Sequence, residues 1–279
     1  MKTSELQRAA DAFRSMHHGE MLILPNAWDA LSARVFAEAG CKAIATTSAG
    51  VAWSLGYPDG ERVPWNDFLA ATGRIARVLS VPLTVDFESG FSATSAELAE
   101  HVRAVIGAGA SGVNLEDSRD HAAHGLLPLE IAAERISIVR DAAAKEGVPI
   151  VINARTDSYL QPAGEGVVPF ADVVQRCRTY VSAGADCVYP IGLADIHLIG
   201  QLTAQLRSPV NVMVRPGAPT LKELRAAGVA RVSTATGPAL LTAGVLMNSI
   251  VKLREAGSAE HFASPFTYPR MQKLFEAGD

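Results

Sequence analysis

The sequence predicts an α/β fold, namely one (β/α)8 barrel that spans residues 1–279. Short apolar runs alternate about eight times with longer stretches of helical spacing, and no break in composition separates two domains. A length of 279 residues is ordinary for one such barrel. The rival fold, a doubly wound sheet, usually has fewer strands and a glycine-rich phosphate turn after the first, which residues 25–29 do not contain.

The predicted strands are apolar enough to be buried on both faces, as the strands of parallel sheets are. They cover residues 21–24, 43–47, 83–86, 112–116, 150–155, 187–190, 210–214 and 231–234.

The stretches between the strands carry helix signals. Phe170, Val174, Cys177 and Val181 are spaced as one face of a helix that covers a sheet. The segments 94–97 and 220–223 have the spacing of a capping box at a helix start. Four Ala-Gly pairs favour helix ends directly before a strand, because glycine adopts the left-handed conformation readily; they end at Gly40, Gly109, Gly184 and Gly228.

The two ends of the chain are also predicted to be helical. Residues up to about Ser15 form a leading helix, and a long helical stretch follows Gly237. The tail beyond it contains Phe262, Phe266 and Tyr268, whose side chains need cover. We therefore expect the C-terminal region from about residue 238 to pack on a neighbouring element or subunit.

Composition excludes several classes of protein. Hydrophobic residues make up 48% and charged residues 19%, unlike a disordered chain. A net charge of −4 indicates neither a nucleic-acid partner nor an anionic membrane surface. No apolar run approaches the roughly 20 residues of a membrane span, and the first residues lack a signal-peptide core. Three scattered cysteines favour a reducing setting, so we expect a cytoplasmic protein.

Carboxylates follow three consecutive predicted strands. Asp86 and Glu88 end the third strand, Glu116 and Asp117 the fourth, and Asp157 follows the fifth. In a barrel the carboxyl ends of the strands form the active site. Converging carboxylates repel one another, and a divalent cation removes that conflict; an oxygen-only set suits Mg²⁺, or Mn²⁺. A single acid here is more simply a helix cap, and we interpret Asp117 and Asp157 as caps or orienting groups.

Two further features lie at the carboxyl ends of the predicted strands. Arg155 offers a planar fork for a substrate carboxylate, but it could equally form a salt bridge that closes the mouth. The second strand ends in the small residues Thr47, Ser48 and Ala49, which allow backbone N–H groups to approach an anion.

Taken together, these segments resemble the isocitrate lyase/phosphoenolpyruvate mutase superfamily over about residues 20–250. The resemblance depends on the order of Asn26-Ala-Trp-Asp29, Thr47-Ser-Ala-Gly50, Leu55-Gly-Tyr-Pro-Asp59, Asp86-Phe-Glu88, Leu115-Glu-Asp117, Ala154-Arg-Thr-Asp157, Gly184-Ala-Asp-Cys-Val-Tyr-Pro190 and Val210-Asn211. It implies a barrel with exchanged C-terminal helices in a dimer of dimers. It also implies Mg²⁺ and a small 2-oxo acid substrate.

The resemblance implies a role for each matching residue. Asp86 would be the principal metal residue, Glu88 and Glu116 its partners through water, and Asp59 an outer acid. The predicted substrate-binding residues are Thr47, Ser48, Ala49, Asp86, Arg155 and Asn211.

Two departures from the family pattern restrict the expected activity. The isocitrate and methylisocitrate lyases carry a Lys-Cys-Gly-His loop with a catalytic cysteine, whereas residues 118–125 contain no cysteine; the lyases also have a glutamate where Ile191 stands. His121 and His124 lie in this loop. We predict His124, together with Arg155, as catalytic, although a solvated loop histidine is the simpler interpretation.

We therefore expect a carbon–carbon lyase that acts through an enolate on a small oxaloacetate-like 2-oxo or 2-hydroxy dicarboxylate, by cleavage or decarboxylation. Three alternatives remain open. They are a C–P hydrolase or mutase acting on a phosphonopyruvate-like substrate, a non-catalytic 2-oxo acid-binding protein, and a barrel enzyme of unrelated chemistry.

Overall fold

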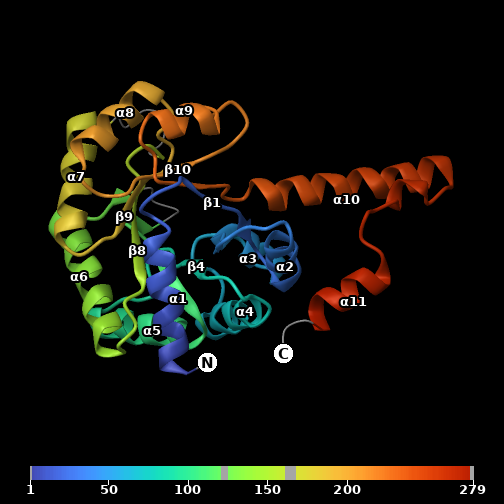
Figure 1. The fold of residues 1–279 in the computed structure, drawn as a ribbon, viewed down its shortest axis with the longest axis horizontal. Helices are drawn as coiled ribbons and strands as arrows, with labels where there is room; N and C mark the ends of the chain where they lie inside the picture. The colour runs from blue at the N-terminus through green and yellow to red at the C-terminus, as the bar shows by residue number, and fades with distance from the viewer. Residues whose placement is uncertain (1, 121–124, 161–167, 277–279) are drawn as a thin grey trace.

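Parallel strands form the centre of the protein, and helices surround them (Figure 1). The computed structural model describes residues 2–120, 125–160 and 168–276. One sheet has the order β2-β3-β4-β5-β8-β9 and a second has the order β1-β11-β10. These strands are β1 (Leu22–Leu24), β2 (Asn26–Ala27), β3 (Ile44–Thr46), β4 (Leu83–Asp86), β5 (Ala110–Glu116), β8 (Val151–Thr156), β9 (Cys187–Pro190), β10 (Asn211–Met213) and β11 (Arg231–Ser233).

The two sheets are connected at two places. β1 belongs to the smaller sheet and β2 to the larger one, and only Pro25 separates them. At the other end, a parallel bridge joins Val188 of β9 to Val210 beside β10. All eight predicted strand segments are confirmed, with bounds that differ by at most two residues. The short β2 and the antiparallel pair β6 (Ser118–Asp120) and β7 (Gly125–Leu126) were not predicted.

Neighbouring helices contact one another in chain order around the outside, from α2 through α4 to α9. The helices are α1 (Thr3–Ser15), α2 (Ala30–Glu38), α3 (Ser48–Ser54), α4 (Trp65–Arg77), α5 (Ser95–Gly107), α6 (Leu129–Lys145), α7 (Phe170–Ser182), α8 (Ile196–Gln205), α9 (Leu221–Ala226), α10 (Gly237–Ala256) and α11 (Tyr268–Glu276). Both predicted capping boxes are present, and the four predicted helix-end glycines have positive φ.

α1 packs across the strands at their amino ends. It contacts β5 and β8, and the ring of Phe13 is fully buried. A Cβ on Gly112 would lie 2.8 Å from Phe13 Cε1, so only glycine fits at this point of β5. Phe13 clusters there with Leu22, Leu24 and Val151, which makes the base of the strand layer apolar.

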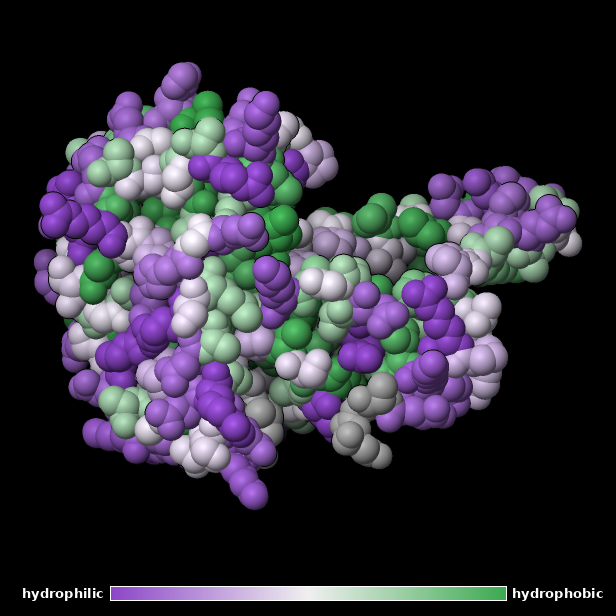
Figure 2. Space-filling view, in the orientation of Figure 1, coloured by the Kyte–Doolittle hydropathy of each residue, from purple (hydrophilic) through white to green (hydrophobic). Residues whose placement is uncertain are grey.

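α10 departs from the body of the protein as a projecting arm (Figure 1). Figure 2 shows apolar side chains on this arm, and its exposed large apolar residues are Leu240, Leu241, Val245, Leu246, Met247, Ile250 and Val251. Within the described ranges, no helix combines the length and the apolar character needed to cross a bilayer.

His17 lies buried directly after α1. Its Nδ1–H donates to the Phe13 carbonyl (2.8 Å), and its ring packs edge-on against the Phe13 ring. Burial, together with the charge of Arg231, lowers the pKa of His17 from 6.5 to about 3. The folded protein therefore holds this imidazole neutral at pH values where the unfolded chain would protonate it.

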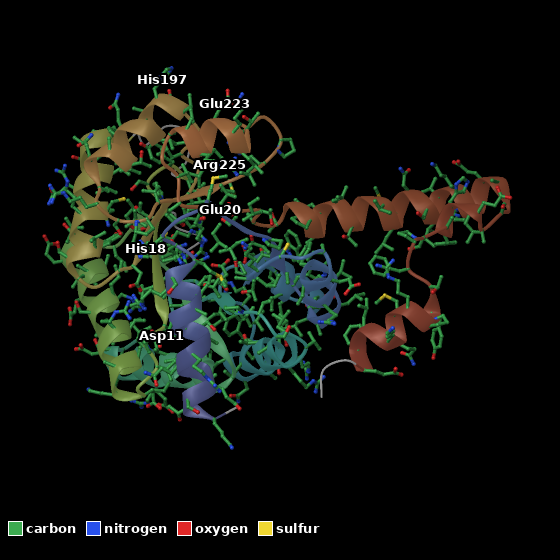
Figure 3. The ribbon with its side chains drawn as sticks, viewed as in Figure 1. Asp11, His18, Glu20, His197, Glu223 and Arg225 are labelled. Atoms are coloured by element: carbon green, nitrogen blue, oxygen red, sulfur yellow. The ribbon has the colours of Figure 1, made fainter. Side chains whose placement is uncertain are left out.

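We predict that this histidine makes the fold sensitive to acid. Between pH 6.5 and pH 3 only the unfolded chain binds the proton, so stability is complete above pH 6.5 and falls as pH decreases, by up to about 1.4 kcal/mol per pH unit. Urea unfolding of the parent at pH 7 and pH 5 should show this loss, and His17→Gln should reduce it by roughly 2 kcal/mol. His197→Gln, at an exposed position of α8 that is labelled in Figure 3, is the matched control and should keep the parent's loss of stability. Equal slopes for the parent and both variants would contradict the prediction.

Candidate active site

Among the residues that the structure describes, Asp86, at the carboxyl end of β4, is held through one of its two carboxylate oxygens. The side chain is buried, with 8% exposed. Oδ2 accepts the backbone N–H of Ser48 at 3.0 Å, and the N–H of Asp86 donates to Thr46 Oγ1 at 2.8 Å. Oδ1 is buried and has no hydrogen-bond partner among the residues that the structure describes. This oxygen is available to a ligand.

The predicted anion cradle lies beside Asp86, at the start of α3. Thr47 is the N-cap, and Ser48 and Ala49 begin the helix; all three are buried. A Cβ on Gly50 would lie 2.7 Å from Thr47 Cγ2 and 2.8 Å from Trp28 Cβ, so the chain needs glycine here. Because the N–H of Ser48 donates to Asp86, the position of this cradle depends on that carboxylate.

Arg155, at the end of β8, forms a buried ion-pair cluster. Nε and Nη2 donate to the two oxygens of Asp157 at 2.6 and 2.9 Å, and Nη1 lies 2.8 Å from Glu116 Oε2. Burial lowers the pKa of Arg155, but the charges of Glu116, Asp157 and Asp86 raise it well above its ordinary value. Of the two interpretations of Arg155, the structure shows the salt bridge, which occupies the Nε–Nη2 edge of the fork.

Asp117 and Asp157, which the sequence suggested as caps or orienting groups, each hold several neighbouring groups. Asp117 Oδ1 accepts the N–H of Asp157 at 2.9 Å, and Oδ2 accepts from Tyr180 Oη at 2.5 Å and from Arg176 Nη1 at 3.1 Å. Burial raises the pKa of Asp117, while the hydrogen bonds from Tyr180 and Asp157 oppose that rise. Ser118 Oγ donates to Asp157 at 2.5 Å and so holds the carboxylate that holds Arg155.

Glu88 lies in a strained loop that a second acid supports. Its φ of 49° is in the left-handed region, which a non-glycine residue adopts at a cost. Glu88 Oε2 accepts the N–H of Glu61 at 2.8 Å, and Glu61 Oε1 accepts the N–H groups of Ser89 and Phe91, both at 2.9 Å. Glu61 carries no signal in the sequence, because it does not follow a strand and no local motif marks it.

The remaining predicted site residues lie in different settings. Asn211 is fully buried on β10, and its Nδ2 donates to Ser233 Oγ at 3.1 Å. Asp59 is exposed in the loop before α4. His121 and His124 lie outside the described residues. In the part of the chain that is described, no three His, Cys, Asp or Glu side chains form a metal-binding group.

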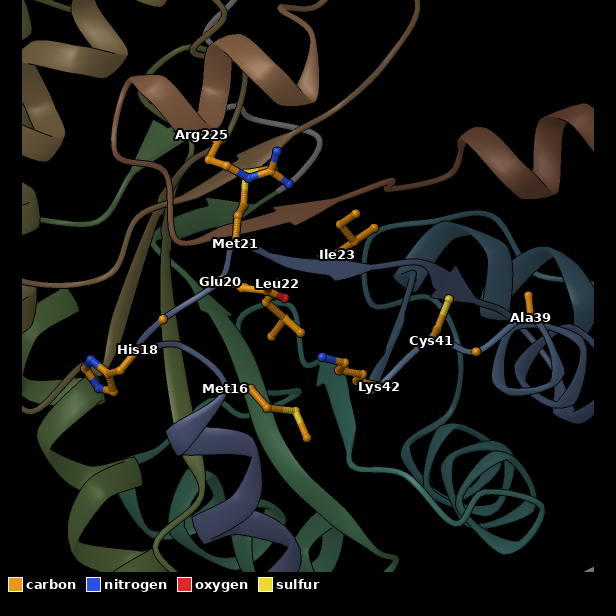
Figure 4. A pocket seen from close by; sticks show the side chains of 12 residues that line it. Met16, His18, Glu20, Met21, Leu22, Ile23, Ala39, Cys41, Lys42 and Arg225 are labelled. Atoms are coloured by element: carbon orange, nitrogen blue, oxygen red, sulfur yellow. The ribbon is translucent and has the colours of Figure 1, made fainter.

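A cavity of about 700 Å³ lies at the opposite end of the strands (Figure 4). Its lining includes Met21 and Ile23 of the β1 segment, Ala39 after α2, Lys42 before β3, and Arg225 of α9. These positions surround the amino ends of β1 and β3, whereas the acids lie at carboxyl ends. The cavity is therefore separate from the candidate active site.

The parallel strands and the acidic residues at their carboxyl ends define an α/β protein of the TIM-barrel-like kind. The model of the phosphoenolpyruvate phosphomutase family matches residues 13–254. The chain belongs to this family, within the isocitrate lyase/phosphoenolpyruvate mutase superfamily, and is an enzyme of that type.

The relatives include lyases and mutases. An uncharacterized protein of Mycobacterium tuberculosis is 35% identical over 81% of this chain and 83% of its own length. The 2-methylisocitrate lyase of Escherichia coli is 34% identical over 69% of this chain and 66% of its own. The crystal structure of a candidate phosphonomutase from Burkholderia cenocepacia is 41% identical, with a TM-score of 0.83, over 88% of this chain and 99% of that one.

We predict that Asp157→Asn destabilises the protein by roughly 3 kcal/mol, because it removes a carboxylate from a buried arginine. Denaturant unfolding near neutral pH measures the change. Asp141→Asn, at an exposed position of α6, should change stability by less than about 0.5 kcal/mol. If the two variants were equally stable, the ion pair would not be what holds Arg155 in place.

Proposed function

We propose that the protein is a Mg²⁺-dependent carbon–carbon lyase that acts through an enolate on a small oxaloacetate-like 2-oxo or 2-hydroxy dicarboxylate. The observation that carries the proposal is Asp86, a buried carboxylate with Oδ2 held by the Ser48 amide and Oδ1 without a partner in the described chain. A carboxylate oxygen in this setting suits a hard cation.

The donor set fits Mg²⁺ held by few protein atoms. Mg²⁺ keeps several waters and commonly binds one or two carboxylates together with its substrate. Asp86 would be the direct ligand, and Glu88 and Glu116 would act through water. Asp59 remains a proposed outer acid. Mn²⁺ is the alternative cation.

The protein's own groups then orient and polarise the acid. Mg²⁺, when bound, would supply positive charge that stabilises the negative charge developing on the substrate. Thr47 and the Ala49 amide hold the substrate carboxylate beside Ser48, whose own amide also holds Asp86 Oδ2, and Arg155 and Asn211 face its other oxygens. Arg155 is pre-oriented, because Asp157 fixes its Nε–Nη2 edge. His124 is the proposed proton donor.

Decarboxylation fits this chain better than cleavage of isocitrate does. It needs support for the oxyanion and a later protonation, but no cysteine in residues 118–125. A protein of Pseudomonas fluorescens named oxaloacetate decarboxylase 1 is 24% identical over 70% of this chain. The second candidate, C–P bond chemistry, has its support in the phosphonomutase-like structure compared above.

We further propose that the strands close into a complete (β/α)8 barrel and that α10 is exchanged between subunits of a dimer of dimers. The strand pairs β1–β11 and β2–β3 and the bridge from Val188 to Val210 support closure. Ile23, which points outward from β1, is 44% exposed, and the cavity in Figure 4 reaches from β1 to α2 and α9. A partner's α10 would cover this surface with its apolar face.

We predict that Asp86→Asn abolishes both Mg²⁺ binding and Mg²⁺-dependent loss of CO₂ from oxaloacetate, because a neutral amide replaces the charged ligand oxygen. Calorimetric titration with Mg²⁺ and a turnover assay with and without EDTA measure the two effects. Asp67→Asn, at an exposed position of α4, is the matched control and should behave as the parent does. Unchanged Mg²⁺ affinity in Asp86→Asn would place the ion elsewhere.

We predict that isocitrate and 2-methylisocitrate are cleaved only at trace rates, although a 2-methylisocitrate lyase is among the relatives. Neither the cysteine of the lyase loop nor the glutamate at the position of Ile191 is present to move the proton. Product formation from these two acids and from oxaloacetate is compared on the same preparation. A kcat of roughly 10 s⁻¹, which is ordinary for an enzyme, on either isocitrate would refute the argument.

A further inference from the structure

A polar layer lies beneath Asp86, where barrels usually contain Val, Ile and Leu. Asn153 of β8, Asn211 of β10 and Arg231 of β11 are all fully buried. The strand register pairs Asp86 with Asn114 and Asn114 with Asn153, and it pairs Asn211 with Arg231. This layer therefore adjoins the candidate active site from below.

Arg231 crosses the interior and has few protein partners. Its Nη2 donates to Asn114 Oδ1 at 3.1 Å, and its guanidinium carbon lies 5.9 Å from the centre of the Phe13 ring. Nε and Nη1 meet no acceptor among residues 2–120, 125–160 and 168–276. A buried N–H group normally has a partner, because an unsatisfied one loses the free energy of its hydration.

The neighbouring side chains indicate what satisfies these N–H groups. Asn153 Oδ1 and Asn211 Oδ1 are buried acceptors that receive no hydrogen bond from the described residues. A bound anion would suit Arg231 but would be repelled by the two amide oxygens. Water can accept from the guanidinium and donate to the amides, so water-mediated contacts fit this layer best.

The charge of Arg231 acts on groups above and below it. Burial lowers the pKa of Arg231 below its ordinary value, and Cys187, Tyr189 and Asp86 oppose that shift only in part. Below it, the same charge contributes to the low pKa of His17. Arg155 differs, because Glu116 and Asp157 offset its charge. The described residues give Arg231 no such ion pair, and its field therefore reaches the site with little compensation.

We propose that Arg231 is a positioning residue whose buried charge, held beneath Asp86 through Asn114, selectively stabilises the more negative, enolate-like form of a bound 2-oxo acid. The inference rests on the proposed function, since it concerns the same substrate site. Arg231 does not touch the substrate. It orients Asn114 and provides a fixed positive potential that needs no reorganisation when charge develops.

The test compares two probes that differ in charge but are similar in size. Pyruvate is a monoanion with a neutral 2-oxo group, whereas oxalate is a planar dianion that resembles the enolate. Calorimetric titration in the presence of Mg²⁺ gives the affinity of the parent, Arg231→Gln and Arg231→Lys for each probe. Arg140→Gln is the matched control, because Arg140 is a part-buried arginine that binds the Gly184 carbonyl and Asp186.

Arg231→Gln should weaken oxalate binding by at least roughly 10-fold and pyruvate binding by less than about 3-fold, the scale expected for a buried charge several ångströms away. Arg231→Lys should recover most of the oxalate affinity, because it restores the charge. Arg140→Gln should lower thermal stability and leave the ratio of the two affinities unchanged.

The outcomes separate this inference from the proposed function. If the parent binds both probes and Arg231→Gln weakens them equally, or not at all, Arg231 has no selective role and the inference fails alone. If the parent binds neither probe with Mg²⁺, the proposed function fails as well. If Arg231→Gln does not fold, as judged by circular dichroism, Arg231→Met takes its place as the neutral variant, with the same expected affinities and the same contradicting result.

Discussion

The buried guanidinium of Arg155 is the charge around which the side chains at the carboxyl ends of the strands are arranged. A full charge out of water needs partners with good geometry, and Arg155 has a bidentate contact to Asp157 and an ion pair to Glu116. Asp157 is held in turn by Ser118, and its backbone N–H is held by Asp117. The ends of β5 and β8 are thereby connected, and Glu116 is oriented before any ligand arrives.

This constraint gives the acids at the rim different tasks. Three acids bind arginine or backbone partners, namely Glu116, Asp117 and Asp157. Asp86 instead retains an oxygen without a partner in the described structure. Glu88 is held by the Glu61 amide in a strained loop, and such strain persists only where surrounding contacts enforce it. Among the described residues, the rim therefore offers the proposed cation an open oxygen of Asp86 beside several engaged carboxylates.

The proposed site therefore lies between two arginines with different surroundings. Arg155 at the rim is compensated by carboxylates, whereas the described residues give Arg231 below it an amide partner and an aromatic ring. The apolar base formed by α1 separates Arg231 from solvent, and low polarity there strengthens its field. His17 directly follows the same helix, so the support of the site and the predicted acid sensitivity of the fold have a common origin.

The sequence by itself determined the alternation of strands and helices, the capped starts and glycine ends of the helices, and the position of Asp86, Glu116 and Arg155 at strand ends. These features depend on local periodicity and backbone preference, which a few neighbouring residues specify. Only the tertiary structure decided that Arg155 pairs with Asp157 and Glu116, that Glu61 supports Glu88, and that Arg231 lies beneath Asp86. Residues 114 and 231 meet across the interior, and such contacts depend on strand register and on how the two sheets face each other, which no local pattern encodes.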